Sequence, residues 1–199
     1  MNVALRLRKV LRTTPFAVAQ RLVSEDTADL IRRKLFPMSQ REARRVLAAL
    51  GAARAPMVLA GGWGVDALVA GRRRHSDLDV IAEPDDLPLL AAALGELGYE
   101  AAAERCEGGW WAPEKVVFRS PGGGRIEVLL LTDAQWERLV RRADAMLGRT
   151  VDPAPVLGDI GGLAVPCLSA PLQLAAYDGY EMNHDQRATR RVLEHLARQ

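Results

Sequence analysis

Two aspartates stand one residue apart in the stretch Asp77-Leu78-Asp79-Val80-Ile81. Alternate residues of a strand share a face, so both carboxylates are expected on one face while Leu78 and Val80 turn toward the core. Like charges held this close raise each other's pKa unless a cation lies between them. Carboxylates are also the ligands with which proteins bind Mg²⁺ together with substrate phosphates. The pair therefore predicts a metal site rather than a structural feature.

A glycine pair upstream offers a place for those phosphates. The apolar run 57–60 ends at Gly61-Gly62, and a short amphipathic segment continues to Gly71, which predicts strand, glycine turn, helix, turn and strand. Because glycine has no Cβ, the N–H groups at the start of the helix can approach an anion closely, and the helix dipole favours negative charge there. The turn is thus expected to bind a phosphate group.

The combined motif is Gly61-Gly62-Trp63, Asp66, Gly71-Arg72 and Arg73-x-His75-x-Asp77-Leu78-Asp79. It resembles the signature of the nucleotidyltransferase superfamily, in particular the antibiotic-modifying branch with lincosamide and aminoglycoside 2''-nucleotidyltransferases. The resemblance covers about 58–193. It implies an α/β (α+β) fold with a small mixed β-sheet and flanking helices, two Mg²⁺ ions, and transfer of a nucleoside monophosphate from a nucleoside triphosphate (NTP) to an acceptor hydroxyl.

The resemblance also implies roles for the motif residues. Asp77 and Asp79 would hold the metal ions. The residues expected to hold the triphosphate, with ATP as the favoured donor, are Gly61, Gly62, Arg73, His75 and Ser76. Arginine forks suit phosphate oxygens, whereas His75 would alternatively support Asp77. For Asp66, a helix cap or a bond to the nearby arginines is slightly favoured over substrate contact.

A third acid, Glu127, lies in the otherwise apolar run 125–131. This run and 116–118 flank a Pro-Gly-rich turn, which predicts a β-hairpin. An unpaired carboxylate there would be costly, so one interpretation is an ion pair with Arg125 or Arg119. The other follows from the resemblance, because the superfamily places its third acid in such a strand, as metal ligand or general base.

Helical patterns surround these strands. Ser39 followed by Glu42 predicts a capping box, and the helix that it starts has an apolar stripe at Ala43, Val46, Leu47 and Leu50. Further helices are expected over 84–97, 132–147 and from 169 to the end, with a strand at 163–168 and a loop over 151–162. We expect a helical N-terminal extension over 1–38, the nucleotidyltransferase domain over 39–168 and a C-terminal helical segment over 169–199 packed on it.

Several features bear on the acceptor without fixing it. Trp110-Trp111, in a glycine-rich loop, would either stack on a base or sugar or plug the loop onto the core. The tail resembles the antibiotic enzymes at Gln173 and Gly179-Tyr180. It departs from them at Tyr177, where the resemblance predicts a histidine in lincosamide enzymes.

Composition is that of an ordinary globular protein, with 49% hydrophobic and 26% charged residues among 199. Residues 1–54 carry 12 Lys+Arg against 4 Asp+Glu, and the remainder carries 15 against 21. The acidic body suits a cationic aminoglycoside. Neither a signal peptide nor a membrane span is predicted, and the two cysteines suit a reducing, cytoplasmic location without disulfides.

These patterns predict a Mg²⁺-dependent nucleotidyltransferase that modifies a hydroxyl of a small molecule, with a lincosamide or aminoglycoside favoured by the resemblance. One alternative is a toxin-type enzyme acting on tRNA or a protein, which rests on the basic first quarter. Another is a catalytically silent nucleotide-binding module, against which the three acids argue. The oligomeric state stays open, with a homodimer as one option.

Overall fold

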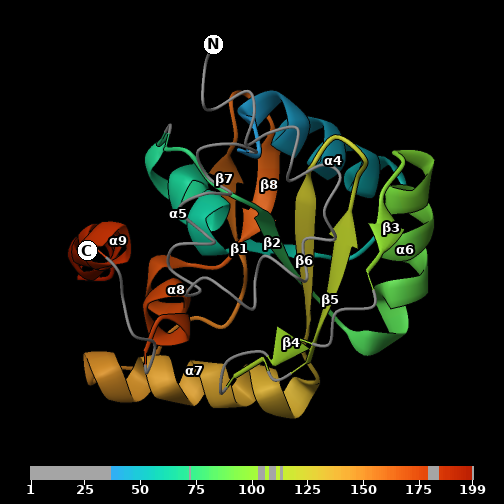
Figure 1. Ribbon diagram of the computed structural model, residues 1–199. Helices are drawn as coiled ribbons and strands as arrows, with labels where there is room; N and C mark the ends of the chain where they lie inside the picture. The colour runs from blue at the N-terminus through green and yellow to red at the C-terminus, as the bar shows by residue number, and fades with distance from the viewer. Residues whose placement is uncertain are drawn as a thin grey trace, which may run out of the picture.

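Figure 1 presents the computed structural model, in which residues 37–71, 73–102, 106–107, 111–112, 114–178 and 184–198 are described. The helices are α4 (Gln40–Ala52), α5 (Gly61–Val69), α6 (Leu87–Glu96), α7 (Asp133–Leu147), α8 (Ala170–Ala176) and α9 (His184–Leu196), with a 3₁₀ turn over Pro84–Asp86. The strands are β1 (Val58–Ala60), β2 (Leu78–Ala82), β3 (Glu100–Ala101), β4 (Cys106–Glu107), β5 (Glu114–Arg119), β6 (Arg125–Leu130), β7 (Val156–Asp159) and β8 (Ala164–Cys167). The helical extension expected over 1–38 falls almost wholly outside these residues.

The strands form one mixed sheet in the order β3-β5-β6-β2-β1-β8-β7, with β4 paired to β5. Two neighbouring pairs, β2 with β6 and β1 with β8, run parallel, and the other pairs are antiparallel. The expected hairpin is present, because β5 and β6 pair along their full lengths. A mixed sheet with helices packed on it confirms the predicted fold class.

One face of the sheet is covered by α4 and α6 (Figure 1). The α4 helix begins where Ser39 Oγ accepts a hydrogen bond of 3.1 Å from the N–H of Glu42, as the capping pattern predicts. Its predicted apolar stripe is buried in full. On the sheet side, Leu78 and Val80 of β2 are fully buried against this layer. The odd-numbered positions of β2 therefore turn to the opposite face.

The opposite face packs against α7 and α8, through a second cluster that includes Ile81, Leu139 and Leu172. A capping box formed by Thr132 and Gln135 begins α7, in agreement with its predicted start. Farther out, α9 packs on α8, and its fully buried Leu193 belongs to an apolar cluster that also contains Val65 of α5. Figure 1 shows α9 at the edge of the molecule, outside α5 and α8.

The expectation of a loop over 151–162 is wrong, because β7 lies within it and pairs antiparallel with β8 at the edge of the sheet. Three of its four residues are exposed and only Gly158 is buried, so β7 lacks the alternating apolar side chains that identify a strand in sequence. Backbone pairing alone defines it. No helix among the described residues is long and apolar enough to cross a membrane.

Candidate active site

Two acids lie side by side at the centre of the sheet. Asp79 of β2 and Glu127 of β6 are register partners on parallel strands, so their side chains leave the same face. Asp77 immediately precedes β2, and its Oδ2 accepts a hydrogen bond of 2.9 Å from the hydroxyl of Ser76. The sequence predicted that the two aspartates share one strand face, and the register of β2 with β6 brings Glu127 to the same face.

The electrostatics of Asp79 reflect this grouping. Burial raises the pKa of the Asp79 carboxyl well above its usual value, and the negative charges of Asp77 and Glu127 raise it further. Lys115 and Arg125 act in the opposite direction and do not cancel the effect. An ionised Asp79 is therefore held at an energetic cost, which a bound cation would relieve.

The glycine turn lies directly against this carboxylate. Ala60 of β1 is the register partner of Asp79, so Gly61, the next residue, begins α5 beside the acid. Gly61 has a φ of +60°, and a Cβ there would collide with Oδ2 of Asp79. The sequence predicted a phosphate-binding turn here, and the structure brings its backbone to the acids.

His75 lies on the other side of the turn. Its Nε2 is 3.0 Å from Oδ2 of Asp66, and its ring centroid is 4.6 Å from that of Trp63. A Cβ on Gly62 would stand 2.7 Å from Cε1 of the imidazole and closer still to Nδ1. The ring is therefore fixed with Nε2 on Asp66 and Nδ1 toward the glycine turn.

Asp66 is fully buried and also binds Arg73. Its carboxylate accepts hydrogen bonds from the Arg73 backbone N–H at 2.9 Å and from Nε at 2.5 Å. Burial opposes its ionisation, but the bonds from His75 and Arg73 outweigh burial and lower the pKa of Asp66. The ion pair offered as the structural interpretation of Asp66 is present. Arg73 Nη2 also lies 2.5 Å from Oδ1 of Asp66 and donates to the carbonyl of Gly62 at 3.2 Å, while Nη1 donates to the hydroxyl of Thr189.

Glu127 is held by two cations. Its Oε1 is 2.5 Å from Nη2 of Arg125, and its Oε2 is 2.8 Å from Nζ of Lys115. The ion pair with Arg125 was one of the two interpretations of this acid. Lys115 was missed, although it occupies the same face of β5 diagonally across from Glu127, a relation that only the register of the hairpin defines.

These contacts bear on whether the acids suit a metal ion. Across the described residues, no three acidic, histidine or cysteine side chains are arranged as a ready set of metal ligands. The carboxylate oxygens of Asp77 and Asp79 are donors that suit a hard divalent cation, and burial with the neighbouring acids raises the pKa of Asp79, so its ionised form is unfavourable without a cation nearby. Asp77 and Asp79 are therefore the residues that would hold such a cation, whereas Glu127 would have to exchange its bonds with Lys115 and Arg125.

The sequence matches the model of the aminoglycoside-2''-adenylyltransferase family over residues 42–193. The chain belongs to this family. No curated protein matches the sequence. The match covers all three acids, the glycine turn and Arg73 with His75, and it agrees with the resemblance found in the sequence.

Comparison with solved structures shows that the chain also shares the fold of known members of such families. It is similar to the lincosamide antibiotic adenylyltransferase LnuA with lincomycin bound, at 18% identity and a TM-score of 0.57, over 79% of this chain and 98% of that one. It is also similar to ANT(2'')-Ia in complex with adenylyl-2''-tobramycin, at 19% identity and a TM-score of 0.53, over 80% and 94% of the two chains. Both neighbours are nucleotidyltransferases, and the adenylyltransferase-family chain shares their fold.

The sequence left two roles open for Trp111, stacking on a ligand or packing its loop onto the core, and the structure shows the second. Its side chain is buried, and its Nε1 donates a hydrogen bond of 3.0 Å to the carbonyl of Ala176 at the end of α8. Trp110 lies outside the described residues, as do Gly179 and Tyr180. Gln173 is buried in α8 against Gly64 of α5, so this tail residue packs behind the glycine turn.

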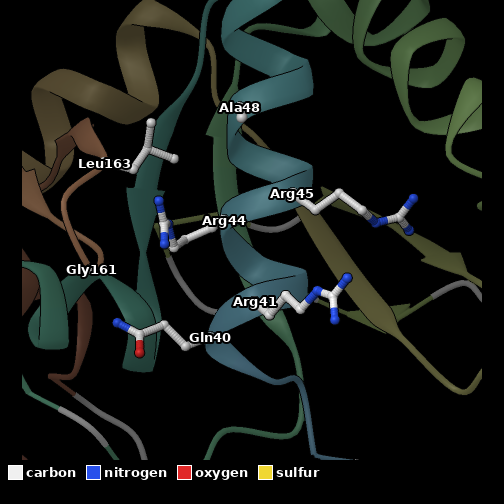
Figure 2. A pocket seen from close by; sticks show the side chains of 7 residues that line it. All are labelled: Gln40, Arg41, Arg44, Arg45, Ala48, Gly161 and Leu163. Atoms are coloured by element: carbon white, nitrogen blue, oxygen red, sulfur yellow. The ribbon is translucent and has the colours of Figure 1, made fainter.

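A hollow of about 510 Å³ on the outside of α4 is separate from the acids of this family member. It is lined by Gln40, Arg41, Arg44, Arg45, Ala48, Gly161 and Leu163. In Figure 2, Arg44 extends toward Leu163 while Arg41 and Arg45 extend to the other side of the helix. Their guanidinium groups therefore do not converge on one ligand, and α4 and the sheet lie between this hollow and Asp79.

Proposed function

We propose that the chain is a Mg²⁺-dependent nucleotidyltransferase that moves a nucleoside monophosphate from an NTP, with ATP as the favoured donor, to a hydroxyl of a small-molecule antibiotic. The observation that carries this proposal is the meeting of Asp79 and Glu127 beside the Gly61 turn. If the turn binds a phosphate, the phosphate and the neighbouring carboxylates are both negative and need a cation between them. This is the arrangement of a metal-assisted phosphoryl-transfer site.

In this proposal, Asp77 and Asp79 hold the metal, and Glu127 serves as third ligand or as general base. When bound, Mg²⁺ would polarise the α-phosphate and neutralise charge on the leaving pyrophosphate. The N–H groups at the start of α5 would bind triphosphate oxygens, with His75 and Ser76 as further contacts. As the base, Glu127 would take the proton of the acceptor hydroxyl while the hydroxyl oxygen attacks the α-phosphorus and the bond to pyrophosphate breaks.

The family and two structural neighbours support the choice of acceptor class. One neighbour binds lincomycin and the other holds an adenylylated tobramycin. Lincomycin is a lincosamide and tobramycin is an aminoglycoside, the two antibiotic classes that the sequence pattern favours. We therefore propose a lincosamide or an aminoglycoside as the acceptor.

The experiment is to measure pyrophosphate release from each of the four nucleoside triphosphates with Mg²⁺, in the presence of lincosamides, aminoglycosides or bulk tRNA. The double variant Asp77→Asn/Asp79→Asn is the control. Release that requires one antibiotic and disappears in the control supports the proposal and names the acceptor. Release with tRNA alone moves the function to nucleic acid. Release without any acceptor that persists in the double variant contradicts the proposed site.

A further inference from the structure

The buried carboxylate of Asp66 links two parts of the loop that precedes the catalytic strand. It accepts three hydrogen bonds, one from the ring of His75 and two from Arg73, and Asp66 itself has 0% of its surface exposed. Asp66 lies on α5, one turn beyond the glycine pair. The positions of Arg73 and His75 are therefore defined relative to the same helix that starts at the glycine turn.

Arg73 joins this carboxylate to two other elements. Its Nη2 donates to the carbonyl of Gly62 at 3.2 Å, and its Nη1 donates to the hydroxyl of Thr189, a buried residue of α9. Because a guanidinium is planar and its donors form a rigid fork, three acceptors bound by one arginine are fixed relative to each other. The three acceptors here belong to the glycine turn, to the body of α5 and to the C-terminal helix.

Through this fork, a side chain 116 residues from Arg73 in the sequence contacts the network that shapes the turn. The turn itself has little freedom, because Asp79 lies against Gly61 and His75 lies against Gly62. A shift of the Gly62 carbonyl would therefore alter the N–H groups that face the phosphates. Thr189 is buried on α9, and Leu193 of the same helix shares an apolar cluster with Val65 of α5 and with residues of α8.

We propose that Asp66, Arg73 and Thr189 are positioning residues that couple the docking of α9 to the geometry of the phosphate-binding turn. This inference rests on the proposed function, since it assigns to Arg73 an indirect action on the triphosphate in place of a direct contact. Because the Thr189 hydroxyl accepts from the same fork that binds Asp66 and the Gly62 carbonyl, coupling through the fork makes NTP binding depend on that hydroxyl.

The test compares Thr189→Val with Thr189→Ser in the full chain. Valine keeps the shape of threonine and removes the acceptor, whereas serine keeps the hydroxyl. We expect Thr189→Val to raise the KM for the NTP roughly three- to tenfold, the range for one lost hydrogen bond, with little change in kcat or in the KM for the acceptor. Thr189→Ser should stay near wild type. The matched control on the same helix is Glu194→Gln, which removes the charge from the partly buried i,i+4 pair with Arg190.

A double-mutant cycle with Arg73→Lys locates the coupling. If the fork carries it, the KM effect of Thr189→Val should largely disappear in the Arg73→Lys background. Additive effects, or equal changes in Thr189→Val and Thr189→Ser, would overturn the proposal while leaving the proposed function intact.

Amide hydrogen exchange supplies a readout that needs no turnover. In Thr189→Val, the amides of residues 61–65 and 73–77 should exchange faster than in Thr189→Ser and Glu194→Gln. Unchanged exchange in these segments contradicts the coupling even if the wild-type protein proves to have another activity. Faster exchange in a protein without pyrophosphate release would uphold the coupling and reject the proposed function.

Discussion

Gly61 lies so close to the carboxylate of Asp79 that a methyl group on it would collide with Oδ2 and stand 2.7 Å from Cγ. The contact arises because Ala60 and Asp79 are register partners in the antiparallel pair of β1 and β2. The chain must therefore leave β1 across the face of an acid. Only glycine provides both the space and the positive φ that this path requires.

Replacing Gly61 with alanine should abolish activity. The new Cβ would be strained at a φ of +60° and would displace the Asp79 carboxylate or the turn itself. We expect kcat/KM to fall at least about 100-fold, because a displacement of about 1 Å at a reacting centre costs that much. Steady-state kinetics measure the loss, and circular dichroism establishes that the variant is folded.

Gly95→Ala is the matched control, since it makes the same substitution in α6, where a Cβ meets nothing within 4 Å. Alanine is favoured over glycine inside a helix by roughly 0.5–1 kcal/mol. This variant should retain full activity and unfold at a slightly higher denaturant concentration. Equal activities of the Gly61 and Gly95 variants would refute the role assigned to the turn.

Asp79→Asn should inactivate the enzyme and stabilise the fold. The pKa of the Asp79 carboxyl is raised in the folded state, so ionisation of this group destabilises the folded protein, and at neutral pH its charge opposes folding. Removing that charge should raise the free energy of unfolding by about 1 kcal/mol in the absence of divalent cations. Denaturant titration measures this gain. Addition of Mg²⁺ should stabilise wild type and leave the variant unchanged, and equal responses of the two proteins would argue against a metal at Asp79.

Glu127→Gln should also inactivate the enzyme, but it should weaken the fold. The substitution leaves Lys115 and Arg125 without their carboxylate partner in a largely buried position. Breaking such a pair costs about 3 kcal/mol. The opposite signs expected for Asp79→Asn and Glu127→Gln distinguish two acids that one activity assay would treat alike. A Glu127→Gln protein as stable as wild type would mean that these ion pairs contribute nothing to folding.

Asp66 should give the fold a specific sensitivity to acid. Its pKa is lowered in the folded state below the ordinary value of an aspartate, so its contribution to stability is complete above that value and is lost as the pH falls through the folded pKa. Asp66→Asn should lower the free energy of unfolding at pH 7 by about 2 kcal/mol. It should also flatten the decline of stability below about pH 4, as urea unfolding at several pH values would record. If the stability of wild type and of Asp66→Asn declined in parallel below about pH 4, the role of Asp66 in this acid sensitivity would be contradicted.

Local sequence determined the elements that carry the chemistry. Glycines after an apolar run required a turn at Gly61-Gly62, and strand alternation put Leu78 and Val80 in the core with Asp79 on the other face. The capping residue Ser39 and the apolar stripe behind it defined α4. These features depend on neighbours within a few positions along the chain, and for that reason they can be read from the sequence.

Tertiary structure decided which groups meet. Asp79 and Glu127 become neighbours through the parallel register of β2 and β6, and Lys115 reaches Glu127 through the hairpin. Thr189 meets Arg73 because α9 docks beside α5. The edge strand β7 is defined by backbone bonds to β8 and has no side-chain pattern of its own. Register and docking depend on contacts between distant segments, and no local periodicity encodes them.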